Sequence, residues 1–164
     1  MSCDAVAFSA MLWMASLNPG QMTGPGPAVA QAPVAPVSVA GEPLFIDIVR
    51  RARQLKAQTE AYRAQLTKTD PTGAAAPLKG FDAFGGRISE LAALNMKGHV
   101  TLRDRGAVDD LKCILRGISQ DLPEKLAAVR AAATIKAQDL ALRDMVYLLN
   151  DNVEVITAPP QPAA

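Results

Sequence analysis

The sequence predicts an all-α fold, an antiparallel bundle of three to four helices preceded by a Pro/Ala-rich leader. Apolar residues make up 49% of the 164 residues and aromatic residues only 4%, a composition that suits close packing of helices better than packing of sheets. Asp4 is the only charged residue before position 42. After that position, apolar residues recur every three or four places in a charged background, as they do in amphipathic helices.

These observations divide the chain into three parts. We expect an apolar leader and a Pro/Ala-rich spacer over residues 1–41, the helical bundle over 42–157 and a disordered tail over 158–164. Residues 31–40 and the tail are rich in proline and carry no charge. Because proline blocks helix formation and these segments have little surface to bury, both are expected to be extended tethers.

The leader contains an uncharged apolar run, AVAFSAMLWMASL, at residues 5–17. The run is too short to span a bilayer, which takes about 20 residues, but it has the length of a signal-peptide core. Ala28 and Ala30 place small residues where a signal peptidase reads them, before Gln31. Two features disagree with export: no Lys or Arg precedes the run, and Asp4 carries the wrong charge. The leader therefore predicts a cleaved signal peptide, with a retained N-terminal tail as the alternative.

The first helix is expected from about Leu44 to Leu66. Pro43 suits a first helical turn, and the turn-forming residues 70–73 mark a stop. The expected buried stripe is Leu44, Ile48, Ala52, Leu55, Thr59, Tyr62 and Leu66.

The second helix is expected from about Phe81 to Met96, with Gly98 as its end. Its stripe is Phe81, Phe84, Ile88, Leu91 and Asn95. Residues 99–102 are the one short stretch that resembles a strand.

The third helix is expected from about Ala107 to Gln120, with a stripe of Val108, Leu111, Leu115, Ile118 and Leu122. Residues 121–124, Asp-Leu-Pro-Glu, have the layout of a capping box, so a fourth helix should begin there. That helix would continue to Ile156 and reach about 50 Å in length. Its middle, 131–137, has few large side chains and is expected to bend or to pack closely against a neighbour.

Few residues in the chain suit catalysis or metal binding. His99 is the only histidine, and it cannot build the usual zinc site without carboxylates or Cys113. Noncovalent haem held by His99 and Met96 or Met145 is a minor alternative. Cys113 is expected to be a small core residue, and a disulfide with Cys3 would require the leader to be kept and folded back. We expect no enzyme activity, no cofactor and no metal.

Charges separate along the bundle. The first helix is locally basic and the end of the last helix is acidic, which gives these candidate interaction residues: Arg50, Arg51, Arg53, Lys56, Arg63, Asp144, Asp151 and Glu154. The basic residues surround much of the helix without interleaved aromatic residues, which favours a solvated face over a nucleic-acid surface. In an antiparallel pair of helices the opposite charges would lie near each other or mark where another copy docks. Carboxylates near a helix C-terminus oppose the helix dipole, which slightly favours a cationic partner.

The sequence thus predicts a non-enzymatic bundle with a heptad-like surface that acts through protein contacts. The expected partner is another protein or a second copy, because a net charge of +1 gives no overall attraction to nucleic acid. The leader favours an exported accessory or assembly component of the bacterial periplasm or cell envelope. One alternative is a cytoplasmic adaptor or subunit whose N-terminal segment inserts into a partner. Another is a bundle that binds haem, metal or a lipid-like molecule.

Overall fold

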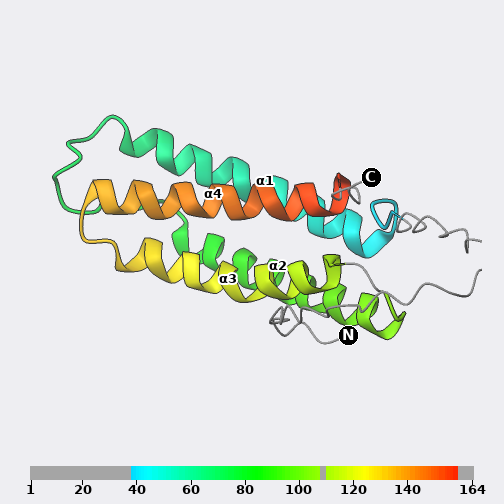
Figure 1. Ribbon diagram of the computed structural model, residues 1–164. Helices are drawn as coiled ribbons and strands as arrows, with labels where there is room; N and C mark the ends of the chain where they lie inside the picture. The colour runs from blue at the N-terminus through cyan, green and yellow to red at the C-terminus, as the bar shows by residue number, and fades with distance from the viewer. Residues whose placement is uncertain (1–37, 108–109, 159–164) are drawn as a thin grey trace, which may run out of the picture. The chain divides into compact units, whose positions relative to one another are not determined.

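A computed structural model describes residues 38–107 and 110–158 (Figure 1). In these ranges the chain forms four helices: α1 (Pro43–Leu66), α2 (Phe81–Asp104), α3 (Leu111–Ala131) and α4 (Ile135–Thr157). The predicted all-α bundle is confirmed. The expectations for the leader, for Val108 and for residues 159–164 lie outside the described residues.

The helices pack as a ring of neighbours in which α1 contacts α2 and α4, and α3 also contacts α2 and α4. Figure 1 shows α1 beside α4 in one layer and α2 beside α3 in the other. We call one end of the bundle the closed end, because residues 67–80 and 132–134 connect the helices there. At the opposite, open end, α1 and α3 begin and α2 and α4 finish.

Helix α1 follows its prediction closely. It begins at Pro43, whose missing N–H is not needed in a first turn. Ile48, Ala52, Leu55, Thr59, Tyr62 and Leu66 of the expected stripe are buried, Leu44 is half-buried, and Phe45 and Val49 are buried as well. The stripe therefore faces the core, as its spacing predicts.

Helix α2 is longer than predicted. It continues through Gly98, so the expected stop there is wrong, and residues 99–102 are helical. Gly98 is buried, and a Cβ there would lie 3.1 Å from Leu115 Cδ1 and 3.4 Å from Phe45 Cε1. Glycine serves close packing at this position. The helix finishes near Gly106, whose φ of +70° favours glycine.

The predicted boundary between the third and fourth helices is also wrong. Helix α3 runs through the supposed capping box with Pro123 inside it, and the expected 50 Å helix is two separate helices. Proline removes only its own hydrogen bond to the preceding turn, while Leu122 and Leu126 beside it are buried in the core. The chain turns at 132–134, within the segment where a bend was expected. There the side chain of Thr134 caps α4 by accepting a hydrogen bond from the N–H of Ala137 at 3.2 Å.

One polar pair crosses the aliphatic core. Asn95 on α2 and Asn152 on α4 are both fully buried. Their side-chain amides exchange two hydrogen bonds, at 2.9 and 2.7 Å, and Asn95 also donates to the Leu91 carbonyl at 3.0 Å. Because α2 and α4 are not direct neighbours in the ring, this pair joins helices that face each other across the bundle.

Candidate interaction surface

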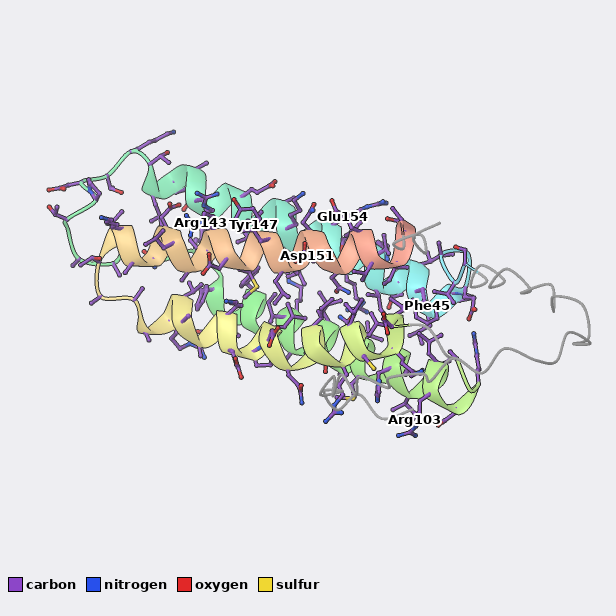
Figure 2. The ribbon with its side chains drawn as sticks, viewed as in Figure 1. Phe45, Arg103, Arg143, Tyr147, Asp151 and Glu154 are labelled. Atoms are coloured by element: carbon purple, nitrogen blue, oxygen red, sulfur yellow. The ribbon has the colours of Figure 1, made fainter. Side chains whose placement is uncertain are left out.

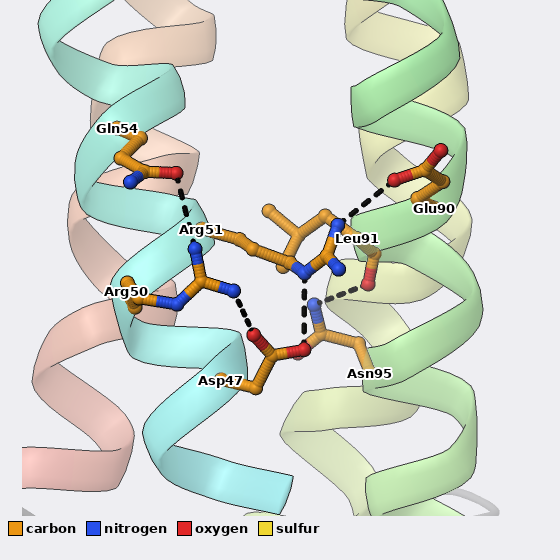
Figure 3. A network of polar contacts seen from close by, with 7 residues as sticks. All are labelled: Asp47, Arg50, Arg51, Gln54, Glu90, Leu91 and Asn95. Atoms are coloured by element: carbon orange, nitrogen blue, oxygen red, sulfur yellow. Dashed lines mark hydrogen bonds and ion pairs between the residues drawn. The ribbon is translucent and has the colours of Figure 1, made fainter.

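Arg51 connects α1 to α2. Its guanidinium donates to Asp47 at 3.0 Å and to Glu90 on α2 at 2.8 Å (Figure 3). Arg50 bonds the other oxygen of Asp47 and lies near Gln54. The hydrogen bonds from Arg50 and Arg51 hold the pKa of Asp47 below its ordinary value. The charges of Arg50 and Arg51 are therefore paired with carboxylates of the same chain.

Lys56 and Arg63 connect α1 to α4. Lys56 Nζ donates to Asn150 Oδ1 at 2.7 Å. Arg63 donates to the two oxygens of Asp139 at 2.8 and 3.3 Å, and this hydrogen bonding raises the pKa of Arg63. The Arg63–Asp139 ion pair thus brings opposite charges of the two antiparallel helices together. The two contacts also fix the register of α1 against α4.

Arg53 differs from the other basic residues of α1. It is exposed and makes no hydrogen bond or ion pair with any residue in the described ranges. It borders a surface groove of about 520 Å³ between α1 and the end of α4, whose apolar lining includes Ile46 and Val49. The guanidinium of Arg53 therefore lies beside apolar surface in the half of α1 that is nearer the open end.

The acidic residues of α4 also differ in their partners. Asp144 pairs with its neighbour Arg143 at 3.3 Å, and Glu154 accepts a hydrogen bond from Asn150 at 2.7 Å. Asp151 is exposed and has no ion-pair or hydrogen-bond partner in the part of the chain that the structure describes. Figure 2 shows Asp151 and Glu154 on α4, with Arg143 nearer the beginning of the same helix.

A second groove lies between α3 and α4. Its volume is about 380 Å³, and its lining consists of apolar or small residues with three carboxylates: Ile114, Gly117, Ile118, Leu148 and Val155 with Asp121, Asp151 and Glu154. Gly117 keeps the groove open, because a Cβ there would meet no atom within 4 Å. Sequence reasoning identified Asp151 and Glu154 but not the groove.

Large apolar side chains are exposed beside these charges. Ile46 is 50% exposed on α1, and Leu140 and Tyr147 are 40% and 62% exposed on α4. Sequence reasoning missed all three. The sequence does contain a signal for them, because each is an apolar residue that lies outside the buried stripe of its helix. We use the name α1–α4 face for the exposed residues Ile46, Arg50, Arg53, Ala57 and Glu60 of α1 with Leu140, Arg143, Tyr147, Asp151 and Glu154 of α4.

His99 lies on α2 and not in the predicted loop. Its Nδ1 is 2.6 Å from the Lys112 carbonyl oxygen, so the ring joins α2 to the first turn of α3. Cys113 is half-buried in that turn, and its suggested partner Cys3 lies outside the described residues. His99 and Cys113, the two candidate zinc ligands, thus lie on the adjacent helices α2 and α3.

Within the described ranges, no group of three or more His, Cys, Asp or Glu residues is arranged to hold a metal ion. The same part of the chain contains no helix with the length and apolarity needed to cross a membrane. Comparison with protein families, with curated proteins and with solved structures finds no match to this chain.

Proposed function

We propose that this protein is a non-enzymatic helical bundle that acts through protein contacts made by its α1–α4 face. One observation supports this proposal. Three of the four large apolar side chains that are exposed in the described ranges lie on α1 and α4, and charges of both signs accompany them. Tyrosine and arginine are enriched where proteins bind one another, because each combines apolar surface with polar groups.

The test is site-specific cross-linking in the native host. A photo-crosslinking amino acid replaces Tyr147 in the full-length chain. The matched control carries the same amino acid at Lys97, which is exposed on α2, away from the α1–α4 face. We expect a discrete cross-linked product from position 147 and none from position 97. Absence of a product at 147, or equal yields at both positions, would contradict the proposal.

The proposed setting is the bacterial cell envelope or periplasm, with the protein as an accessory or assembly component. Its support is the sequence of residues 5–17 and the small residues Ala28 and Ala30. The intact mass of protein isolated from the native host tests it. A mass that begins at Gln31 is expected after cleavage, and a full-length mass would favour the cytoplasmic adaptor. Cleavage before Gln31 would also remove Cys3.

A further inference from the structure

We propose that the partner of the α1–α4 face is the same face of a second copy, in a homodimer whose twofold axis runs parallel to the helices. This inference rests on the proposed function, because it names the partner of that surface. It is carried by the match between residues of α1 and residues of α4 when two copies are placed face to face.

The register inside one chain determines the register between two copies. α1 and α4 are antiparallel, and Lys56–Asn150 and Arg63–Asp139 show which residues lie at the same height. A twofold axis parallel to the helices places α1 of each copy over α4 of the other, without a shift along the axis. Residues at the same height within one chain therefore face each other between the copies.

This register brings complementary residues together. The two contacts give registers that differ by four residues, and the mean of the two places Arg53 level with Asp151, and Arg50 level with Glu154. It also places Ala57, a small residue, level with Tyr147, the most exposed large apolar residue. Glu60 falls level with Arg143 within about one residue, the rise of a single helical step. Each pairing occurs twice in a symmetric dimer.

The spacing on α1 fits a helix-packing seam. Ile46, Arg50, Arg53, Ala57, Glu60 and Ala64 are separated alternately by four and three residues, and all six are exposed. The spacing is that of a heptad, and Ile46, Ala57 and Ala64 are its apolar positions. The buried stripe of α1 lies on the opposite side of the helix, so α1 has one seam for its own core and a second seam that nothing in the described chain covers.

One of the charge pairs of the dimer, Arg53 with Asp151, consists of charges that the single chain leaves without a partner in the described ranges. Arg51, Lys56 and Arg63 are bonded to residues of α1, α2 or α4 in the same chain. Arg53 and Asp151 have no such bond in the described ranges. Opposite charges that face each other across an interface set its register and exclude other alignments.

The size of the face suits a dimer. Two adjacent helices about 35 Å long and roughly 20 Å wide together present about 700 Å² per copy, close to the 800 Å² or so of a typical specific interface. Each helix of the face carries charges of both signs: Arg50, Arg53 and Glu60 on α1, and Arg143, Asp151 and Glu154 on α4. A uniformly basic or acidic partner would therefore match only half of it, whereas a second copy matches both halves.

A charge-swap experiment on the full-length chain tests the dimer. Sedimentation equilibrium at roughly 100 μM, where a complex with a micromolar Kd is almost fully assembled, should give the dimer mass for the wild type. Arg53→Asp and Asp151→Arg should each raise the dimer Kd by about tenfold or more, because each places like charges opposite one another twice. The double variant should restore the Kd toward the wild-type value, because opposite charges face each other again.

The matched control is Lys97→Asp, which reverses an exposed charge on α2 and should leave the Kd unchanged. Circular dichroism of every variant should show wild-type helicity, since both substituted side chains are exposed. A wild type that is monomeric at this concentration would overturn the inference, as would single variants that dimerise normally or a double variant that is not rescued. If the wild type is monomeric but position 147 cross-links to a different protein, the inference fails and the proposed function stands. If neither association is seen, both fail.

Discussion

The two ends of the bundle are held together by different kinds of interaction. At the closed end, the first N–H groups of α4 are bonded to another part of the chain: Ile135 to the Gly73 carbonyl and Lys136 to the Pro71 carbonyl, both at 3.0 Å. The Gln138 side chain exchanges two hydrogen bonds of 3.0 Å with the backbone of Ala76. At the open end, His99 Nδ1 lies 2.6 Å from the Lys112 carbonyl oxygen, and Arg105 forms an exposed ion pair with Glu42.

The core differs along the same direction. Near the closed end, Tyr62, Phe81 and Phe84 pack together, with ring centroids 5.5 to 6.4 Å apart. Toward the open end the core contains the buried Asn95–Asn152 pair together with the buried ring of Phe45. Aromatic packing and backbone bonds depend little on salt and pH, whereas exposed ion pairs contribute little and are screened. We infer that the closed end is the stable half and that the open end opens first.

The largest effect is expected from Phe84→Ala. Phe84 is fully buried in the aromatic cluster, so its truncation should lower the free energy of unfolding by about 3–5 kcal/mol. Urea denaturation followed by circular dichroism measures this change. A loss below about 1 kcal/mol, the cost of an ordinary substitution, would show that the closed end is not the stable half.

Asn152→Leu should lower the free energy of unfolding by about 2–3 kcal/mol, because it leaves the side-chain oxygen of Asn95 without its donor in the core. The matched double variant, with Asn95→Leu as well, should be clearly more stable than the sum of the two single losses predicts. The double-mutant cycle in urea gives this coupling. Strict additivity would mean that the two amides do not bond each other.

Gln138→Leu should lower the free energy of unfolding by about 1–3 kcal/mol, because the backbone N–H and carbonyl of Ala76 lose their partners. Hydrogen exchange should also become faster in the 67–80 connection. The matched control is Gln120→Leu, a substitution of an exposed glutamine on α3. Equal effects of the two substitutions would show that the Gln138 bonds do not hold the closed end.

The smallest effect concerns the pH dependence of the open end. The hydrogen bond from Arg105 holds the pKa of Glu42 below its ordinary value of 4.5. The pair therefore stabilises the fold fully above that value, and this contribution is lost as the pH falls through the lower, folded-state pKa. Glu42→Gln should reduce the fall of Tm between neutral and acidic pH. Glu124→Gln, which removes an exposed carboxylate of α3 that has no ion pair in the described ranges and lies outside the α1–α4 face, should leave that fall unchanged.

The sequence predicted the elements wherever the signal was local. Pro43 and the turn residues 70–73 marked the two ends of α1. The repeat of apolar residues every 3.6 positions predicted which side of the helix faces the core. The end of α2 was missed because Gly98 allows close packing against Leu115, which only the neighbouring helix reveals. The break before α4 was missed because bonds from a distant connection cap that helix.

The candidate surface was predicted in part for a similar reason. Charge patterning identified Arg53 and Asp151, but it did not show that Arg63 is used by Asp139 within the chain. That distinction depends on which helices are neighbours and on their register. Ile46 and Tyr147 lie outside the stripes that form the core, so the spacing of the core residues does not predict that they are exposed.

Reactivity of the two tyrosines tests most directly whether the α1–α4 face is covered in solution. Tyr62 is 3% exposed and donates its hydroxyl proton to the Lys79 carbonyl, so it serves as an internal control, whereas Tyr147 is 62% exposed in the single chain. Full-length protein is nitrated at low and at high concentration, and each site is quantified by peptide mass spectrometry. We predict that Tyr147 reacts readily in dilute protein and becomes protected at high concentration, while Tyr62 is protected in both. Full reactivity of Tyr147 at every concentration would contradict the dimer and leave the α1–α4 face without its predicted partner.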